Sequence, residues 1–411
     1  MAPSQTLAES RARCVGSPSM DDAIRGAVGA AAVSSSACGP SDQPSQPVRF
    51  RTRGDFVAIL DRFGLSLVAA AQPNRLIFLG AVDGQLTTNT TLVSNPMGLA
   101  VDAGRLAVAT AHSILVFGNA SRLAPLYPAR PDYYDAYFLP RTIHLTGGCR
   151  THDIVFARHA IIAANAIFSC ICRIDGGSHF TPLWRPSFIS ALRAEDRCHL
   201  NGFTGQNEEL CYVTALAATD TPWGWRKDLY TSGVLIDARR NTILRSDLCM
   251  PHSPRLVGDD LYLLNGGKGE VLRIDRGTGE SIVTTRLPGF VHGLCHHGGV
   301  LFVGMSQERI SRSNSDAPPV AGQHPSLVAG IAAIDAKSGN ILGAVEFDGV
   351  TEVFDIQPLS GVRRAGMQSL VAGDEYDGVE AADAGFWMKK TDHTPEAAVS
   401  GNYQIRLDIK L

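Results

Sequence analysis

Two segments of this chain repeat one another, and that repeat constrains the fold more than any other feature. HDIVFARHAIIAANAIFSCICRID begins at His152 and HSPRLVGDDLYLLNGGKGEVLRID begins at His252; in each, an Ile-Asp pair ends the segment 23 residues after the histidine. Each segment is predicted to form three short strands, because β-branched and aromatic residues favour strands whereas Gly, Asn and Asp favour turns. The chain is therefore expected to contain several copies of one small β-unit.

Further copies of this unit follow one another along the chain. A third begins at His292 and a fourth near His199, each with an insertion before its own Ile-Asp. A fifth begins at Met97, and a sixth is split, with its first strand near residue 352 and the others near residue 65. Repeats of roughly 40–60 residues with about four strands each are typical of a β-propeller.

The copies predict an all-β fold, a six-bladed β-propeller in which N- and C-terminal strands share one blade. Sharing a blade closes the ring and removes free strand edges. Seven blades are the alternative, because the sequence beyond residue 365 has no assigned strand, and a β-sandwich would not explain a histidine at the head of several repeats. Residues 1–47 are expected to be a flexible leader (a transit peptide is the minor alternative), 48–365 the propeller, and 366–411 a C-terminal extension packed on it.

Charge and cysteine usage restrict the partners and the compartment. The net charge is −3 and only 19% of residues are charged, with no basic stripe, so neither nucleic acid nor a membrane surface is an expected partner. No apolar run approaches the ~18 residues that a spanning helix requires. Nine cysteines at irregular spacing do not indicate a disulfide framework, so we expect a reducing compartment and a cytoplasmic protein. The oligomeric state is left open.

The repeats also align the residues at the head of each first strand. The aligned pairs are Met97-Gly98, His152-Asp153, Asn201-Gly202, His252-Ser253, His292-Gly293 and Phe354-Asp355. In a propeller the first strand of each blade lines the central channel, so these heads should converge at one mouth. Residues two apart on a strand share a face, which places His199 and Glu352 at nearly the same level.

Clustered imidazoles suit a first-row transition metal, with iron or copper favoured and zinc as a further candidate. Three or four histidines with an open coordination position are typical of a catalytic site. The predicted metal ligands are His152, His199, His252 and His292. Glu352 is expected to complete the set or to orient a ligand histidine. The alternative is that these side chains only fill the channel with polar groups.

Other residues near the heads are candidates for catalysis or substrate binding. Besides Glu352, the expected catalytic residues are Arg255 and Asp153, which lie close to His252 and His152. The expected substrate-binding residues are Arg150, Asn201, Trp223, Trp225 and Arg226.

Two insertions near the mouth contribute to that set. The stretch DTPWGWR is expected to cover the pocket, with two tryptophan walls and an arginine to hold an anion; the alternative is a loop folded back with its tryptophans packed. The stretch WRPSFISALRAEDRCHLNG is expected to include a short helix that delivers His199 into the channel.

Several stretches together carry a family resemblance. They are THDIVF, WRPSFISALRAEDRCHLNG, YVTALAATDTPWGWR, MPHSPRLVGDDLYLLNGGKGEVLRID, LPGFVHGL and TEVFDIQPLSGVRR. Over residues 60–365 the chain resembles an uncharacterised bacterial family of conserved hypothetical, propeller-like proteins that carry a domain of unknown function. The resemblance implies a stand-alone propeller domain without a named activity. It places His152, His199, Asn201, His252, Arg255, Glu352 and Asp355 in the family's motifs.

The resemblance also bears on the fourth histidine. The position of His292 is often Arg in the family, which makes three histidines plus Glu352 the safer ligand set. The leading hypothesis is a metal-dependent enzyme, an oxidoreductase or oxygenase acting on a small molecule or peptide. The first alternative is a lyase, epimerase or hydrolase that uses the same histidines with or without metal. The second is a propeller that binds a ligand or peptide without catalysis.

Overall fold

Short apolar strands joined by tight turns make up most of the chain. In this computed structural model residues 47–158, 160–307, 317–370 and 374–390 are described. From residue 47 onward, the described residues form one compact unit. Apart from Pro47, the leader predicted at residues 1–47 lies outside the described residues.

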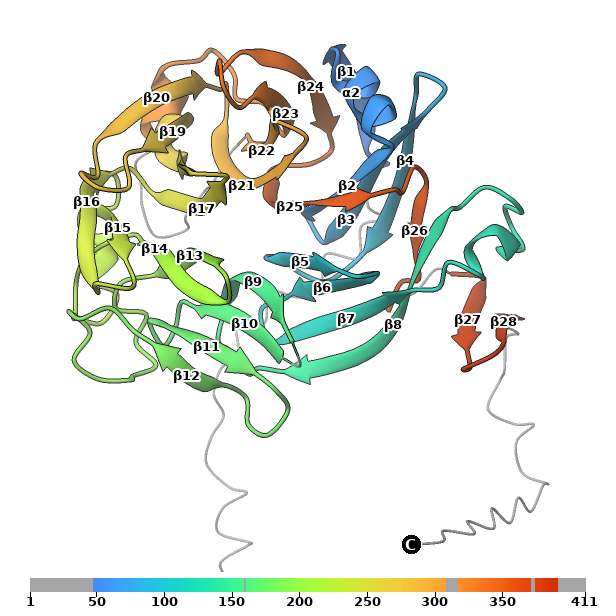
Figure 1. The fold of residues 1–411 in the computed structure, drawn as a ribbon, viewed down its shortest axis with the longest axis horizontal. Coiled ribbons are helices and arrows are strands. Elements are labelled where there is room, and N and C mark those ends of the chain that lie inside the picture. Colours follow the sequence, from blue (N-terminus) through green and yellow to red (C-terminus); the bar gives the residue numbers. More distant parts are fainter. Residues whose placement is uncertain (1–46, 159, 308–316, 371–373, 391–411) are drawn as a thin grey trace, which may run out of the picture. The chain divides into compact units, whose positions relative to one another are not determined.

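The strands form six small sheets arranged in a ring, which confirms the predicted six-bladed β-propeller (Figure 1). We number the blades 1 to 6 by the chain order of their innermost strands. Blade 1 contains β5 (Leu99–Asp102), β6 (Arg105–Ala109), β7 (Ser113–Asn119) and β8 (Ala136–Leu145). Blade 2 contains β9 (Thr151–Ala157), β10 (Ala160–Asn165), β11 (Cys170–Ile174) and β12 (Thr181–Trp184). Blade 3 contains β13 (Leu200–Gln206), β14 (Glu209–Ala215), β15 (Gly233–Asp237) and β16 (Thr242–Leu248).

The second half of the ring has the same layout. Blade 4 contains β17 (Pro251–Val257), β18 (Asp260–Asn265), β19 (Glu270–Ile274) and β20 (Ser281–Arg286). Blade 5 contains β21 (Phe290–His297), β22 (Val300–Ser306), β23 (Gly330–Asp335) and β24 (Ile341–Asp348). Blade 6 contains β25 (Glu352–Ser360), β2 (Leu65–Gln72), β3 (Arg75–Val82) and β4 (Gln85–Leu92). Short helical turns are η1 (Ala124–Leu126), η2 (Gly224–Arg226), η3 (Gly266–Lys268) and η4 (Pro319–Gly322).

The Ile-Asp pairs that revealed the repeat have a structural reason. Each pair lies at the end of a blade's third strand, and the aspartate side chain accepts a backbone N–H from the following turn. Asp275 Oδ1 accepts from Gly277 at 2.9 Å and from Thr278 at 2.7 Å, and Asp335 Oδ1 accepts from Ser338 at 2.8 Å. These backbone hydrogen bonds stabilise the carboxylate form and lower the pKa of both aspartates.

Burial is concentrated between neighbouring blades. Each adjacent pair of sheets encloses its own hydrophobic cluster, and the largest lies between blades 5 and 6, where the helix α2 (Phe56–Phe63) adds Phe56 and Leu60. Strands of blades 5 and 6 such as β2 and β22 are buried along nearly their whole length. This explains their continuous apolar sequences, since both faces of each sheet are covered.

The ring is closed at three places by segments from the two ends of the described chain. In blade 6, the C-terminal β25 pairs with the N-terminal β2, from Leu65 opposite Ser360 to Gln72 opposite Glu352. This confirms the predicted shared blade. In addition, β1 (Arg49–Gly54) pairs with β24 of blade 5, and β26 (Ala365–Met367) pairs in parallel with β8 of blade 1.

Part of the predicted C-terminal extension packs on blade 1. The strands β27 (Tyr376–Glu380) and β28 (Gly385–Lys389) form a hairpin. Trp387 of this hairpin donates its indole N–H to Leu123 O at 3.0 Å, and its ring meets those of Tyr127 and Tyr137 at 5.0 Å. Residues 391–411 of the extension lie outside the described residues.

Candidate functional site

The six inner strands begin with two successive levels of side chains around the central channel. We call the first members of the aligned pairs, together with His199, the histidine level: Met97, His152, His199, Asn201, His252, His292 and Phe354. We call the second members the acceptor level: Gly98, Asp153, Gly202, Ser253, Gly293 and Asp355. Because consecutive residues of a strand point to opposite sides, the two levels have different surroundings.

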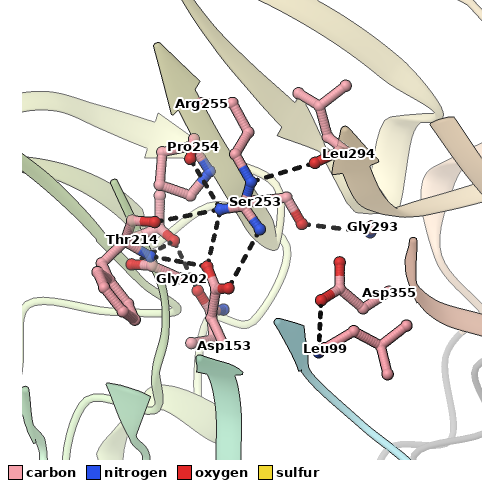
Figure 2. A network of polar contacts seen from close by, with 12 residues as sticks. Leu99, Asp153, Gly202, Thr214, Ser253, Pro254, Arg255, Gly293, Leu294 and Asp355 are labelled. Atoms are coloured by element: carbon pink, nitrogen blue, oxygen red, sulfur yellow. Dashed lines mark hydrogen bonds and ion pairs between the residues drawn. The ribbon is translucent and has the colours of Figure 1, made fainter. Parts of the chain in front are cut away.

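The acceptor level alternates around the ring. Blades 1, 3 and 5 have glycine there, whereas blades 2, 4 and 6 have Asp153, Ser253 and Asp355. Each polar side chain accepts a backbone N–H from the next blade. Asp153 Oδ2 accepts from Phe203 at 3.1 Å, Ser253 Oγ from Gly293 at 3.2 Å, and Asp355 Oδ2 from Leu99 at 2.8 Å (Figure 2).

Close approach of the strands explains why the other three positions are glycine. A Cβ added to Gly98 would lie 2.5 Å from His152 O, and one added to Gly293 would lie 2.7 Å from Asp355 Cα. Gly293 also has a φ of 73°, which L side chains rarely adopt. The glycines therefore allow the six strand heads to approach closely, and the alternating acceptors form hydrogen bonds between neighbouring blades.

A buried ion pair strengthens this level. Arg255 donates to both carboxylate oxygens of Asp153, at 2.8 and 3.1 Å, and its Nε donates to Leu294 O at 3.1 Å (Figure 2). Asp153 and Arg255, both predicted to be catalytic, line a cavity of about 210 Å³ further along the inner strands, and neither lines the cavity of the histidine level. Both residues therefore contribute to the contacts between blades 2, 3, 4 and 5, and their catalytic role stays a prediction.

Asp355 of the same level has an unusual ionisation. Burial raises the pKa of this carboxyl to about 7, Arg255 opposes the rise, and the charge of Asp153 adds to it. Asp153 and Asp355 thus both lie near Arg255, and Asp355 stays protonated up to nearly neutral pH.

The histidine level brings the four predicted imidazoles together as two pairs. The His152 and His199 rings lie 4.8 Å apart between centroids, and those of His252 and His292 lie 4.2 Å apart. Phe354 contacts one member of each pair, His152 at 5.4 Å and His292 at 4.3 Å. All four histidines are at most 6% exposed.

A buried carboxylate that the sequence reasoning missed orients one of these histidines. Both oxygens of Asp196, which is fully buried, lie 2.9–3.0 Å from His199 Nδ1. Nδ1 therefore carries the proton, and Nε2 is the nitrogen with the lone pair. The acidic residue three positions before His199 was the available signal, but Glu195 is adjacent, and only the backbone path shows which of the two turns inward.

The segment that carries this pair is irregular, so the predicted short helix in residues 184–202 is wrong. Side chains of neighbouring segments bind its backbone: Ser187 N donates to Asn241 Oδ1 at 2.9 Å, and Ser190 N donates to Asp220 Oδ1 at 3.1 Å. Asp196 and His199 have φ values of 45° and 50°, which end any helical path. These contacts come from blade 3 residues far along the chain and are not visible in the local sequence.

The histidine level opens into a cavity of about 790 Å³. Its walls include His152, His199 and Glu352, the exposed Arg150, and the insertion between β14 and β15 with Trp223, Trp225 and Arg226. The size falls within the roughly 300–1,000 Å³ of small-molecule sites. His252 and His292 are not among the residues that line this cavity, and Met250 O accepts the His252 Nδ1–H at 2.8 Å.

The insertion that contains DTPWGWR was predicted either to cover the pocket or to fold back with its tryptophans packed, and it does both. Trp225 is buried in a small core with Leu216 and Phe290, yet it also lines the cavity and packs against the His199 ring at 4.4 Å. Trp223 is 40% exposed at the mouth. The Arg226 guanidinium lies over both indoles, 4.9 Å from Trp223 and 4.8 Å from Trp225.

Asn201, predicted to bind substrate, is used within the fold. Its Nδ2 donates to Pro251 O at 3.0 Å, and its Oδ1 accepts from the Thr214 hydroxyl at 2.7 Å. The side chain therefore links blades 3 and 4 and does not line the 790 Å³ cavity.

The described His, Cys, Asp and Glu side chains do not form a ligand set for one metal ion. Within the described residues, no group of three or more His, Cys, Asp or Glu side chains is placed to hold one ion. Phe354 contacts His152 of one pair and His292 of the other. The seven cysteines of the described part are free and buried, and burial raises the pKa of Cys149 to about 11 and of Cys198 to about 12.

Comparisons with known proteins identify a family and a set of structures. The family described as "Domain of unknown function (DUF4915)" matches residues 54–367, which covers all six blades. No curated protein matches the sequence. None of the described helices is both long enough and apolar enough to span a bilayer.

Three solved structures are among those similar to the chain. A chain of the Nidogen/Laminin complex has 12% identity and a TM-score of 0.46, covering 72% of this chain and 99% of that one. A protein of unknown function from Bacteroides caccae has 11% identity and a TM-score of 0.43, covering 72% and 98%. The computationally designed Ika8 protein has 12% identity and a TM-score of 0.34, covering 72% and 90%.

Proposed function

The chain belongs to the family of the Domain of unknown function (DUF4915), and from its site we propose an enzyme that binds a small molecule in the 790 Å³ cavity and uses His199 as a general base. The observation that carries this proposal is the buried Asp196–His199 pair at the cavity wall. A lyase or an epimerase uses such a base to take a proton from carbon, and this is the class that we propose; a hydrolase would use the base on water.

The chemistry follows from the protonation of the pair. Asp196 accepts the Nδ1–H and so leaves the lone pair on Nε2. A proton leaves the substrate for Nε2, and the ring becomes an imidazolium. The buried carboxylate at 2.9 Å then stabilises the new positive charge in a region of low dielectric constant. The same proton is available to a leaving group, or it returns to the face of the carbanion from which it was taken.

Deuterium incorporation tests this proposal without a known substrate. Full-length protein is incubated in D₂O with pooled metabolites, and mass spectrometry detects C–H positions that exchange. We expect exchange of at least one compound with wild type, and a loss of about 10²–10⁴-fold with His199→Gln and with Asp196→Asn. His144→Gln on the outer strand β8 is the matched control. Equal exchange by wild type and His199→Gln would contradict the proposal.

A metal-dependent oxidoreductase or oxygenase is the second candidate. It is supported by the pairing of four imidazoles, and by the Nδ1 contacts of His199 and His252, which resemble the outer contacts of metal-bound histidines. Iron or copper is favoured, with zinc as the further candidate. Because the described side chains do not form a set for one ion, we derive no reaction step through a metal.

Elemental analysis distinguishes the two candidates. Untagged protein is purified and its metal content and absorption spectrum are measured. One equivalent of iron or copper that is lost together in His152→Ala and His252→Ala, with the fold retained, supports the metal enzyme. Substoichiometric metal, together with His199-dependent exchange in chelator, supports the acid–base enzyme.

Location and partners belong to the same proposal. A cytoplasmic enzyme with a small-molecule or peptide substrate, and with neither nucleic acid nor membrane as partner, agrees with free cysteines in the described part and a net charge of −3. Ligand binding without His199-dependent exchange or bound metal would instead indicate a non-catalytic binding propeller.

A further inference from the structure

We infer that the cavity of the histidine level takes a small carboxylate that has an aromatic or other flat apolar portion, with Arg226 binding the carboxylate and Trp223 and Trp225 contacting the flat portion. This inference rests on the proposed function, since it names the substrate class of the same cavity.

The first support is the way Arg226 is held. Its guanidinium carbon lies over both indole rings, 4.9 Å from the Trp223 centroid and 4.8 Å from the Trp225 centroid, and these cation–π contacts restrict its position. The planar guanidinium presents paired N–H donors that match the two oxygens of a carboxylate. Indole contact also does not neutralise the charge.

The second support is the charge balance of the cavity wall. Arg150 and Arg226 both line the cavity, and Glu352 is the acidic residue among its lining side chains. Within the described part of the chain, neither arginine forms an ion pair with a carboxylate. The two arginines of the cavity wall therefore favour an anionic ligand.

The third support is the distance between the anion site and the base. Arg226 lies 4.8 Å from the Trp225 ring, and that ring lies 4.4 Å from His199. A ligand whose carboxylate meets Arg226 can therefore extend along the indole and present a neighbouring atom to His199. The apolar side chains of Met97, Ile167 and Leu229 complete the walls around the remainder of the ligand.

Calorimetric titration of the full chain tests this inference with three probes. They are 3-phenylpropionate, its neutral isostere 3-phenylpropanamide, and phenyl phosphate. We expect the carboxylate to bind at least about ten-fold more tightly than the amide, as for a charge-assisted pair, and more tightly than the phosphate. Arg226→Gln should bring carboxylate and amide to within about two-fold, and Arg226→Lys should keep part of the preference.

The matched control is Arg130→Gln. Arg130 also lies over an aromatic ring, 4.5 Å from Tyr133, but it does not line the cavity. It should leave the preference unchanged. The inference is overturned if the amide binds as well as the carboxylate, if the preference survives Arg226→Gln, if phenyl phosphate binds best, or if none of the probes binds.

Failure of the inference and failure of the proposed function can be told apart. Binding is measured in His199→Gln as well as in wild type, and we expect the carboxylate preference in both. An Arg226-dependent preference without His199-dependent exchange would sink the general base and leave the carboxylate site standing. Exchange of neutral compounds without any carboxylate preference would support the general base and rule out the carboxylate site.

Discussion

The histidine level and the acceptor level lie one residue apart on the same strand heads, yet they have different neighbours. At the histidine level, imidazoles contact one another and aromatic rings, and two of them line a cavity of about 790 Å³. At the acceptor level, Asp153, Ser253 and Asp355 each accept an N–H from the next blade. The difference shows that the histidine level lines the candidate site, whereas the acceptor level stabilises the ring of blades around it.

The largest expected effect comes from breaking the ion pair below the histidines. Asp153→Ala leaves Arg255 as a buried charge without its carboxylate, and we expect the free energy of unfolding to fall by about 3–5 kcal/mol. Urea denaturation monitored by circular dichroism measures the loss. Asp102→Ala is the matched control, because Asp102 binds Arg105 through both oxygens, at 3.0 and 2.7 Å, but on an exposed hairpin. That change should cost less than about 1 kcal/mol, and equal losses would contradict the distinction.

A smaller effect is expected from filling the glycine positions. In Gly202→Ala the new methyl would lie 2.8 Å from Pro254 Cδ and from Thr214 Oγ1, so the strand heads must move apart. Overpacking of this kind costs about 1–3 kcal/mol. Gly322→Ala, where a Cβ meets nothing within 4 Å, should be nearly neutral by the same urea measurement. A neutral Gly202→Ala would show that the strand heads tolerate separation.

The acceptor level should also give stability a pH dependence. The pKa of Asp355 is about 7 in the folded protein, against an ordinary value of 3.8 for an aspartate in the unfolded chain, so the folded protein keeps a proton that the unfolded chain loses. The contribution of this group is fully present below pH 3.8 and disappears as the pH rises through about 7. Asp355→Asn should remove a downward slope of up to about 1.4 kcal/mol per pH unit. Urea titrations between about pH 4.5 and 6.5, which lie within this window, test the slope, and identical slopes for wild type and variant would contradict it.

The smallest expected effect on stability belongs to the histidine level. In His199→Asn the amide N–H₂, which is bonded to Cγ as Nδ1 is, can still donate to Asp196, so the free energy of unfolding should change by about 1 kcal/mol or less. The same variant should abolish His199-dependent exchange. A loss as large as that of Asp153→Ala would instead support the alternative that the histidines only fill the channel.

The repeat made the fold predictable because the same pattern of strands and turns recurs in the sequence of several blades. Asp275 and Asp335 end their strands in the same turn, and the signature is visible wherever that turn recurs. The split blade could also be predicted, since a ring needs a partner for β2 and the remaining unpaired repeat begins at Glu352.

The site was less predictable because its details depend on contacts between distant segments. The repeat alignment identified the heads that carry His152 and His252, but it did not separate the two levels or show that Asp153 and Asn201 also link neighbouring blades. Asp196 was missed because an irregular path, held by Asn241 and Asp220, turns it inward. Local sequence carries no signal for such a path.

The closure of blade 6 has a consequence for synthesis on the ribosome. The apolar strand β2 is completed at Gln72, whereas its inner partner β25 begins only at Glu352, which is translated 280 residues later. At roughly 5–20 residues per second, the interval is on the order of tens of seconds. During that time β2 has an open edge, and the nascent chain is exposed to misassociation until β25 emerges. The shared blade removes the free edge of β2 in the finished ring, but blade 6 can be completed only after β25 has been translated. We therefore expect a chaperone to bind and shield β2 until then.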